Sequence, residues 1–164
     1  MLHVASVFGN RVVGSHVLIE LVGDLPTLTK TIDEAVGAGL IVEGDEGYSF
    51  TLALIREVLY SELNLPRRQF LHLRAAESIE AVHSQPQSYL ASLANHYRLA
   101  GRMADPEKTI DYSLHAGDAA LSVYAYDQTM LHWKAALEVM EREDVEPARR
   151  AAVLERLGSL TVSR

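Results

Sequence analysis

Apolar residues recur three or four positions apart along most of this chain, and one short segment near the middle of its first half breaks the pattern. This spacing is typical of amphipathic helices. Residues 1–8 and 15–22 each predict a short helix, and Thr27 can cap a third helix that Gly37 and Gly39 end. The inward positions expected in this third helix are Leu28, Ile32, Ala35 and Val36.

A β-hairpin is predicted after these helices. Two short apolar runs, residues 40–43 and 48–50, flank the turn sequence Gly-Asp-Glu-Gly. Residues 52–60 return to helical spacing, with an apolar side expected to consist of Leu52, Ile55, Val58 and Leu59. Three helices followed by a hairpin is the order of a winged helix, and we place this domain at residues 1–63.

The remainder of the chain, residues 64–164, predicts helices alone. Pro66 and Pro106 can each occupy the first turn of a helix, Asp105 can cap one, and Gly101 can end one. The helices between these breaks predict antiparallel hairpins that resemble degenerate tetratricopeptide repeats, because small residues recur where two helices of a pair would touch. The positions that fit this pattern are Leu90, Leu93, Ala94, Tyr97 and Gly101 for a first helix, Thr129, Trp133 and Ala136 for a second, and Leu154, Leu157 and Gly158 for another first helix.

The segment from Phe50 to Tyr60 carries a family resemblance. Its sequence, Phe-Thr-Leu-Ala-Leu-Ile-Arg-Glu-Val-Leu-Tyr, resembles the last helix of the winged-helix domain in signal-transduction ATPases with numerous domains (the STAND class), which include large LuxR-type regulators. Residues 93–101 and 116–120 resemble the helical region that follows this domain in the same ATPases. The resemblance covers almost the whole chain. It implies a mainly α protein in which a winged helix precedes tetratricopeptide-like hairpins.

Leu52 departs from the family's pattern. The family usually has a histidine there, which is thought to touch the nucleotide's phosphates, so the resemblance implies that a nucleotide-sensing residue has been lost. Alternatively, Leu52 extends the apolar side formed by Ile55 and Leu59, and we favour this packing role. Arg56 matches the family's arginine, which implies a pair with an acid of a nucleotide-binding domain; an exposed helix arginine is the simpler alternative, and we favour it. The candidate interaction residues are Arg56, Tyr97 and Trp133.

Composition excludes several kinds of chemistry. The chain has no cysteine, which excludes disulfides, thiolate metal sites and thiol catalysis. It has no Gly-x-x-x-x-Gly-Lys-Ser/Thr loop for phosphates, and its aromatic residues are spaced as core residues, so we expect no cofactor and no catalytic residue. The histidines lack the spacing of metal ligands, so we expect no metal site. They are His3, His16, His72, His83, His96, His115 and His132.

The charge pattern argues against DNA as the partner. The formal net charge is −7, and the third helix of the predicted winged helix carries Lys30 against Asp33 and Glu34. Three acids follow in the hairpin, namely Glu43, Asp45 and Glu46. A DNA reader needs lysine or arginine on these elements to neutralise phosphates. The alternative hypothesis, a small winged-helix transcription factor, requires a mobility shift of DNA at low salt that the Lys30→Glu substitution abolishes.

These observations together predict a non-catalytic interaction module. The partner implied by the resemblance is the nucleotide-binding domain of a parent ATPase, while the helical hairpins would bind a protein or an inducer. No apolar run approaches the roughly 18 residues that span a bilayer, and residues 1–8 are too short for a signal peptide, so we expect a cytoplasmic protein. Residual ATP hydrolysis is a further alternative, which a hydrolysis assay on this chain would detect.

Overall fold

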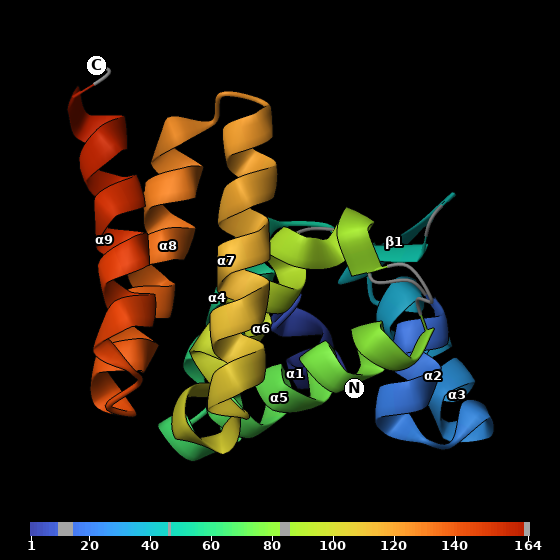
Figure 1. Cartoon of the computed structure of the whole chain (residues 1–164). Coiled ribbons are helices and arrows are strands. Elements are labelled where there is room, and N and C mark those ends of the chain that lie inside the picture. The colour runs from blue at the N-terminus through green and yellow to red at the C-terminus, as the bar shows by residue number, and fades with distance from the viewer. Residues whose placement is uncertain (10–14, 46, 83–85, 163–164) are drawn as a thin grey trace. The chain divides into compact units, whose positions relative to one another are not determined.

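The computed structural model describes residues 1–9, 15–45, 47–82 and 86–162, and within these ranges the chain is mainly helical with one β-hairpin (Figure 1). The expectation of a mainly α fold with a small hairpin is confirmed. The chain divides into two compact units, Met1–Ser84 and Gln85–Arg164. The division therefore falls after Ser84, whereas the sequence placed it after residue 63.

The first unit consists of four helices around a hairpin, followed by a longer helix. Its elements in order are α1 (Leu2–Ser6), α2 (Ser15–Val22), α3 (Leu25–Gly37), β1 (Ile41–Gly44), β2 (Gly47–Phe50), α4 (Ala53–Ser61) and α5 (Leu65–Val82). The two strands pair antiparallel, with Ile41 opposite Phe50 and Gly44 opposite Gly47, so the predicted hairpin is confirmed. Its turn residue Glu46 lies outside the described residues.

Helix α3 begins three residues before the predicted position. Asp24, and not Thr27, is its N-cap, because the Asp24 Oδ2 atom accepts a hydrogen bond from the Thr27 backbone N–H at 3.1 Å. Pro26 lies in the first turn, where its missing N–H leaves no intrahelical bond unmade. Leu28, Ile32 and Ala35 are buried as predicted, but the prediction for Val36 is wrong, since 41% of this residue is exposed.

The core of the first unit explains where the unit ends. Val7 from the chain after α1 packs in one cluster with Leu63, Leu71 and Ala75, of which the last two belong to α5. Tyr60, at the end of α4, packs on this cluster, and its hydroxyl lies 3.0 Å from Nε2 of the buried His72 on α5. Helix α5 is therefore part of the first unit's core, although its sequence reads as the start of a separate helical region.

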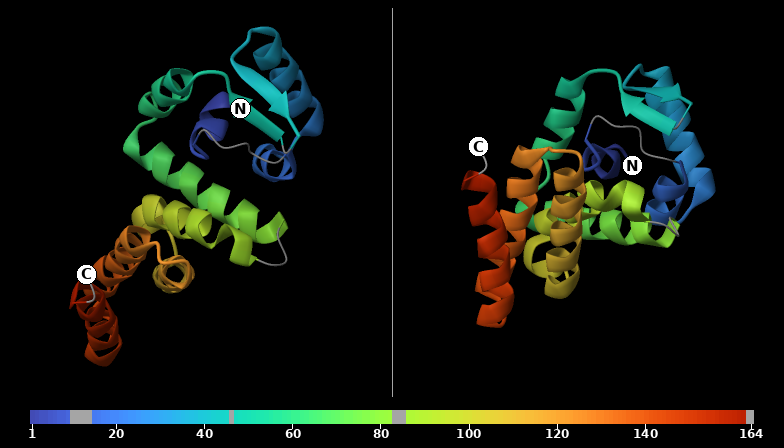
Figure 2. Two further views of the ribbon diagram at one scale, coloured as in Figure 1. Left: turned by 90° about the horizontal axis from the view of Figure 1, so that it is seen from above. Right: turned by 45° about the horizontal axis from the view of Figure 1, so that its top comes forward.

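The second unit is a stack of helices. Its elements are the 3-10 turns η1 (Pro86–Tyr89) and η2 (Gly101–Met103) and the helices α6 (Leu90–Ala100), α7 (Pro106–Ser122), α8 (Tyr126–Arg142) and α9 (Pro147–Val162). Helices α7, α8 and α9 lie side by side, and because short turns join them, neighbours run in opposite directions (Figures 1 and 2). Asp105 caps α7 through the backbone N–H groups of Glu107 and Lys108, and Pro106 follows it, as predicted.

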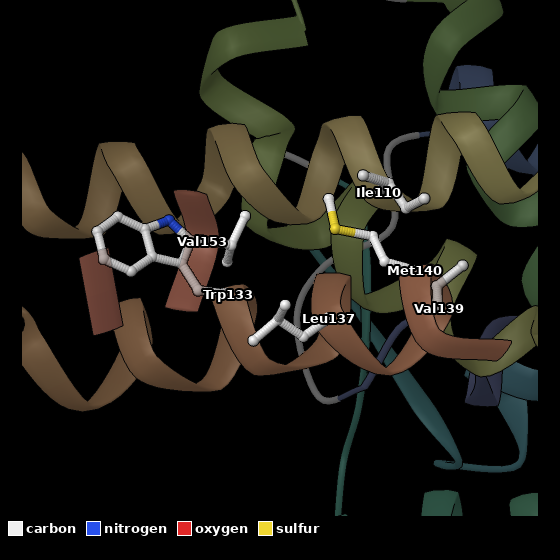
Figure 3. Close-up of a cluster of buried hydrophobic side chains, with 6 residues drawn as sticks. All are labelled: Ile110, Trp133, Leu137, Val139, Met140 and Val153. Atoms are coloured by element: carbon white, nitrogen blue, oxygen red, sulfur yellow. The ribbon is translucent and has the colours of Figure 1, made fainter. Parts of the chain in front are cut away.

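The core of the second unit lies between these helices (Figure 3). Helix α8 supplies most of it, and α7 and α9 contribute one fully buried side chain each to the cluster. The cluster consists of Ile110, Trp133, Leu137, Val139, Met140 and Val153. Trp133 is the largest of them, and its ring lies directly against Gly117 of α7, where any side chain would overlap the indole.

A buried serine on α7 should limit the stability of this unit. Ser113 is fully buried, and its Oγ atom has no hydrogen-bond partner in the described part of the chain. Because an unsatisfied buried hydroxyl keeps its desolvation cost, and alanine is the better helix former, Ser113→Ala should raise the free energy of unfolding by about 1 kcal/mol. Urea denaturation followed by circular dichroism measures this change.

The matched control is Thr109→Val on the same helix. Thr109 is also buried, but its Oγ1 atom donates to the Asp105 carbonyl oxygen at 2.9 Å. Removing that hydroxyl should lower the free energy of unfolding, by about 1 kcal/mol. A loss of stability in Ser113→Ala would mean that the Ser113 hydroxyl does have a partner.

Candidate functional site

The helix with the family resemblance, α4, exposes apolar side chains. Leu52 is the N-cap residue, with extended backbone angles, and its residue surface is 60% exposed. The predicted packing of Leu52 beside Ile55 and Leu59 is therefore wrong: those two side chains are half-buried, and Leu52 lies outside the helix. The same prediction is wrong for Val58, which is 48% exposed.

Leu54 and Val58 form an apolar outer surface on α4. Leu54 is 66% exposed, and the four-residue spacing places both side chains on one side of the helix. None of the residues of α4 is fully buried, although Ile55 and Leu59 turn towards the interior of the unit. Exposed apolar residues that cluster on one element commonly mark a protein–protein contact. We call Leu52, Leu54 and Val58 the α4 surface.

Arg56 lies on a different side of α4, where it contacts α1 of the same unit. Its residue is half-buried, and its Nη1 atom donates to the carbonyl oxygen of Ser6, the last residue of α1, at 3.4 Å. A cation beside the carbonyl end of a helix is a favourable arrangement. Arg56 thus holds α1 against α4, and its pairing with an acid of a partner stays a prediction.

Tyr97 and Trp133 are core residues of the second unit, each only 1% exposed. The Tyr97 ring stacks on Tyr112 with 5.4 Å between centroids, which joins α6 to α7. Trp133 donates its indole N–H to Oδ1 of Asp118 at 3.0 Å, which joins α8 to α7. Neither side chain presents a surface to a partner in this structure, so both act through the packing of the helices.

A row of ion pairs links α7 to α9 and was not predicted from the sequence. Arg149 of α9 donates from Nη1 to Glu107 at 2.7 Å and from Nη2 to Asp111 at 2.9 Å. Arg156, two turns further along α9, pairs with Asp118. The hydrogen bond from Arg149 to Glu107 is the main reason that the pKa of this guanidinium is raised.

The sequence did contain a signal for this row. The three acids lie four and then seven positions apart on α7, and the two arginines lie seven apart on α9, so each set falls on one side of its helix. Matching charges at matching helical spacing predict that two helices can pair. The Arg156 guanidinium also lies 4.1 Å from the centroid of the Trp133 ring, a cation–π distance.

The described residues were compared with the donor sets that metal ions require. Within them, no group of three histidine, aspartate or glutamate side chains could hold a metal ion. The side chains of His16 and His83 lie outside the described residues. One cavity of the first unit, between Leu18, Ile32 and Phe50, measures about 10 Å³, which is room for about one water molecule.

The expected DNA-reading helix, α3, presents a mixed and mainly acidic surface. Lys30, Asp33 and Glu34 are all exposed on it, and Glu43 and Asp45 are exposed in the hairpin. The Tyr48 hydroxyl donates to Glu43 Oε1 at 3.5 Å, and burial, followed by this carboxylate, raises the pKa of Tyr48. A surface of this charge repels phosphate.

His132 should make the second unit sensitive to acid. It is buried on α8, and burial, followed by the positive charge of Arg98, lowers its pKa below the ordinary value of 6.5. The unfolded chain therefore takes up a proton more readily than the folded chain, so the free energy of unfolding should decrease as the pH falls below about 6.5. Urea denaturation at several pH values measures the slope.

His132→Gln should remove part of this pH dependence. The matched control is His115→Gln, which changes an exposed histidine of the same unit. An identical slope in His132→Gln and in the unsubstituted chain would show that His132 does not titrate differently on folding.

Comparison of the chain with protein-family models, curated proteins and solved structures found no match. Within the described residues, no helix combines the length and apolar character needed to cross a membrane. Within the described residues, the α4 surface and the row of ion pairs between α7 and α9 are the two features that bear on function.

Proposed function

We propose that this chain is a non-catalytic protein-interaction module of the kind found in STAND-type ATPases or LuxR-type regulators, with a winged helix followed by tetratricopeptide-like hairpins. The observation that carries the proposal is the α4 surface. Leu52, at the N-cap of α4, is 60% exposed, and Leu54 and Val58 on the helix are 66% and 48% exposed. No residue of α4 is buried. Burying these side chains against a partner would gain free energy in proportion to the apolar area removed from water.

The element order of the first unit supports the winged-helix part of the proposal. Three helices precede the hairpin, and α4 follows it directly. The acidic α3 and hairpin favour a protein partner over DNA, because Lys30 is the only cation among the exposed charges on α3. The partner that the resemblance suggests is the nucleotide-binding domain of a parent ATPase, which would bind α4.

The packing of α7 on α8 supports the tetratricopeptide-like part. Small or short side chains meet between these helices: Ala136 and Thr129 are fully buried, and Gly117 accommodates the Trp133 ring. This combination of small residues with one large ring in a helix pair is the pattern expected of such repeats.

Binding to a nucleotide-binding domain of a STAND-type ATPase from the same genome tests the proposal. Isothermal titration calorimetry with the full chain should detect a complex that Leu54→Gln/Val58→Gln weakens at least tenfold, because two apolar side chains leave the contact while glutamine preserves the helix. Leu25→Gln is the matched control, since Leu25 is 55% exposed in the same unit but on α3.

Two results would contradict the proposal. The first is that no candidate domain binds the full chain at concentrations up to about 100 μM, which corresponds to a binding free energy weaker than about −5.5 kcal/mol. The second is that Leu25→Gln weakens binding as much as the α4 variant does, which would place the contact elsewhere in the unit.

A further inference from the structure

Helix α9 buries few apolar side chains in its unit and also contacts α7 through three ion pairs. Among its described side chains only Val153 is fully buried, and Leu157 and Leu160 are partly buried against the core cluster. By contrast, α8 buries eight side chains. Apolar burial is the dominant force that holds helices together, so α9 has the smallest share of it in this stack.

The charged contacts of α9 are long-range and exposed. Arg149 and Arg156 reach Glu107, Asp111 and Asp118 across the space to α7, and the side chains in these pairs are 35% to 61% exposed. Exposed ion pairs are weak individually and are screened by salt. The attachment of α9 should therefore weaken as the ionic strength rises, while the α7–α8 pair stays packed.

The side of α9 that faces α7 and α8 has a simple repeating pattern. Arg149, Val153, Arg156 and Leu160 follow at spacings of four, three and four residues, so arginine and aliphatic side chains alternate along one side. The α7–α8 face offers the complementary groups. Carboxylates of α7 pair with the two arginines. The Trp133 and Leu137 side chains of α8 lie in one cluster with Val153 (Figure 3).

We propose that the α7–α8 face is an exchangeable docking site for an amphipathic helix with two arginines seven residues apart around a branched aliphatic residue, and that α9 is the occupant supplied by the chain itself. Detachment of α9 frees this face for a partner helix of the same chemistry. The inference deepens the proposed function, on which it rests for the view that the second unit binds a protein.

Hydrogen exchange of the full chain, followed by mass spectrometry, tests the detachment. Amides of α9 should exchange at least tenfold faster than those of α8 at 50 mM NaCl, and the ratio should increase at 500 mM NaCl. In Arg149→Gln/Arg156→Gln the ratio of α9 to α8 exchange rates at 50 mM NaCl should equal the ratio that the unsubstituted chain shows at 500 mM NaCl. The matched control is Arg142→Gln, which removes an exposed ion pair to Glu143 at the end of α8 and should change nothing.

Fluorescence reports the same event, because Trp133 is the only tryptophan of the chain and lies under Arg156. In Arg149→Gln/Arg156→Gln its emission should shift to longer wavelength and be quenched more readily by acrylamide. The far-ultraviolet circular dichroism should lose no more helix signal than the 16 residues of α9 contribute. Equal exchange rates in α8 and α9 under every condition would overturn the inference, since the two helices would then open only together.

A labelled synthetic peptide of residues 147–162 tests the docking site in trans. It should bind the full-length Arg149→Gln/Arg156→Gln variant by fluorescence anisotropy, and a peptide carrying Arg149→Glu and Arg156→Glu should bind at least tenfold more weakly. Equal binding of both peptides, or none, would overturn the inference. These measurements need no nucleotide-binding domain, so their failure is distinguishable from failure of the α4 contact.

Discussion

Replacing Trp133 with alanine should cause the largest loss of stability of any single substitution in the second unit. Trp133 is 1% exposed, and it contacts all three helices of the stack: it lies on Gly117 of α7, it belongs to α8, and Arg156 of α9 covers its ring. Removing a buried tryptophan side chain typically lowers the free energy of unfolding by about 3–5 kcal/mol, because apolar contacts are lost and a cavity remains. Urea denaturation followed by circular dichroism measures this loss.

Such a loss approaches the whole stability of many domains, which is about 5–15 kcal/mol. Asp118 would also lose the indole N–H that it accepts at 3.0 Å. Leu131→Ala is the matched control on the same helix, because Leu131 is 53% exposed and should cost less than about 1 kcal/mol. A loss of less than about 1 kcal/mol in Trp133→Ala would show that the ring does not organise this core.

Most of the features that local sequence determines were predicted correctly. Asp105 followed by Pro106 starts α7, and two short apolar runs around a Gly/Asp turn form the hairpin. Capping and turn formation involve residues within a few positions of one another, so the sequence carries the information directly. The start of α3 was mispredicted because Asp24 and Thr27 can both cap a helix, and the local pattern does not choose between them.

The features that depend on distant parts of the chain could not be predicted in the same way. On α4, Ile55 and Leu54 are equally apolar, and helical periodicity alone does not decide which side turns inward. The exposed positions of Leu52 and Val58 follow from the core that lies beneath the helix. The pairing of Arg149 with Glu107 joins residues 42 positions apart, which no local rule addresses.

For the same reason, the first unit ends at Ser84 and not at residue 63, where the sequence places the boundary. Helix α5 has the composition of the helices that follow it, and Pro66 marks its start as a break in the chain. However, Leu71 and Ala75 pack with Val7 from the beginning of the chain, so α5 completes the first core. A break in secondary structure is local, whereas membership of a core is a long-range property.

Gly117→Ala should cause the second large loss of stability, although alanine normally favours a helix. A β-carbon at this position would overlap the Cδ1 and Nε1 atoms of Trp133 and would lie 3.2 Å from Cγ. The indole cannot retreat easily, because Asp118 and Arg156 hold it from other sides. Overpacking of this kind costs about 1–3 kcal/mol and occasionally more, against about 1 kcal/mol gained in helix propensity, so we expect a net loss of up to about 2 kcal/mol.

Two further variants separate the overlap from other effects of the substitution. Gly158→Ala changes a helical glycine of α9 whose added β-carbon would meet nothing within 4 Å, and it should raise the free energy of unfolding by up to about 1 kcal/mol. In a Trp133→Leu background the smaller side chain removes the overlap, so Gly117→Ala should cost much less there than in the unsubstituted chain. Equal costs in both backgrounds would contradict the view that residue 117 is glycine because the Trp133 ring occupies the space of a side chain.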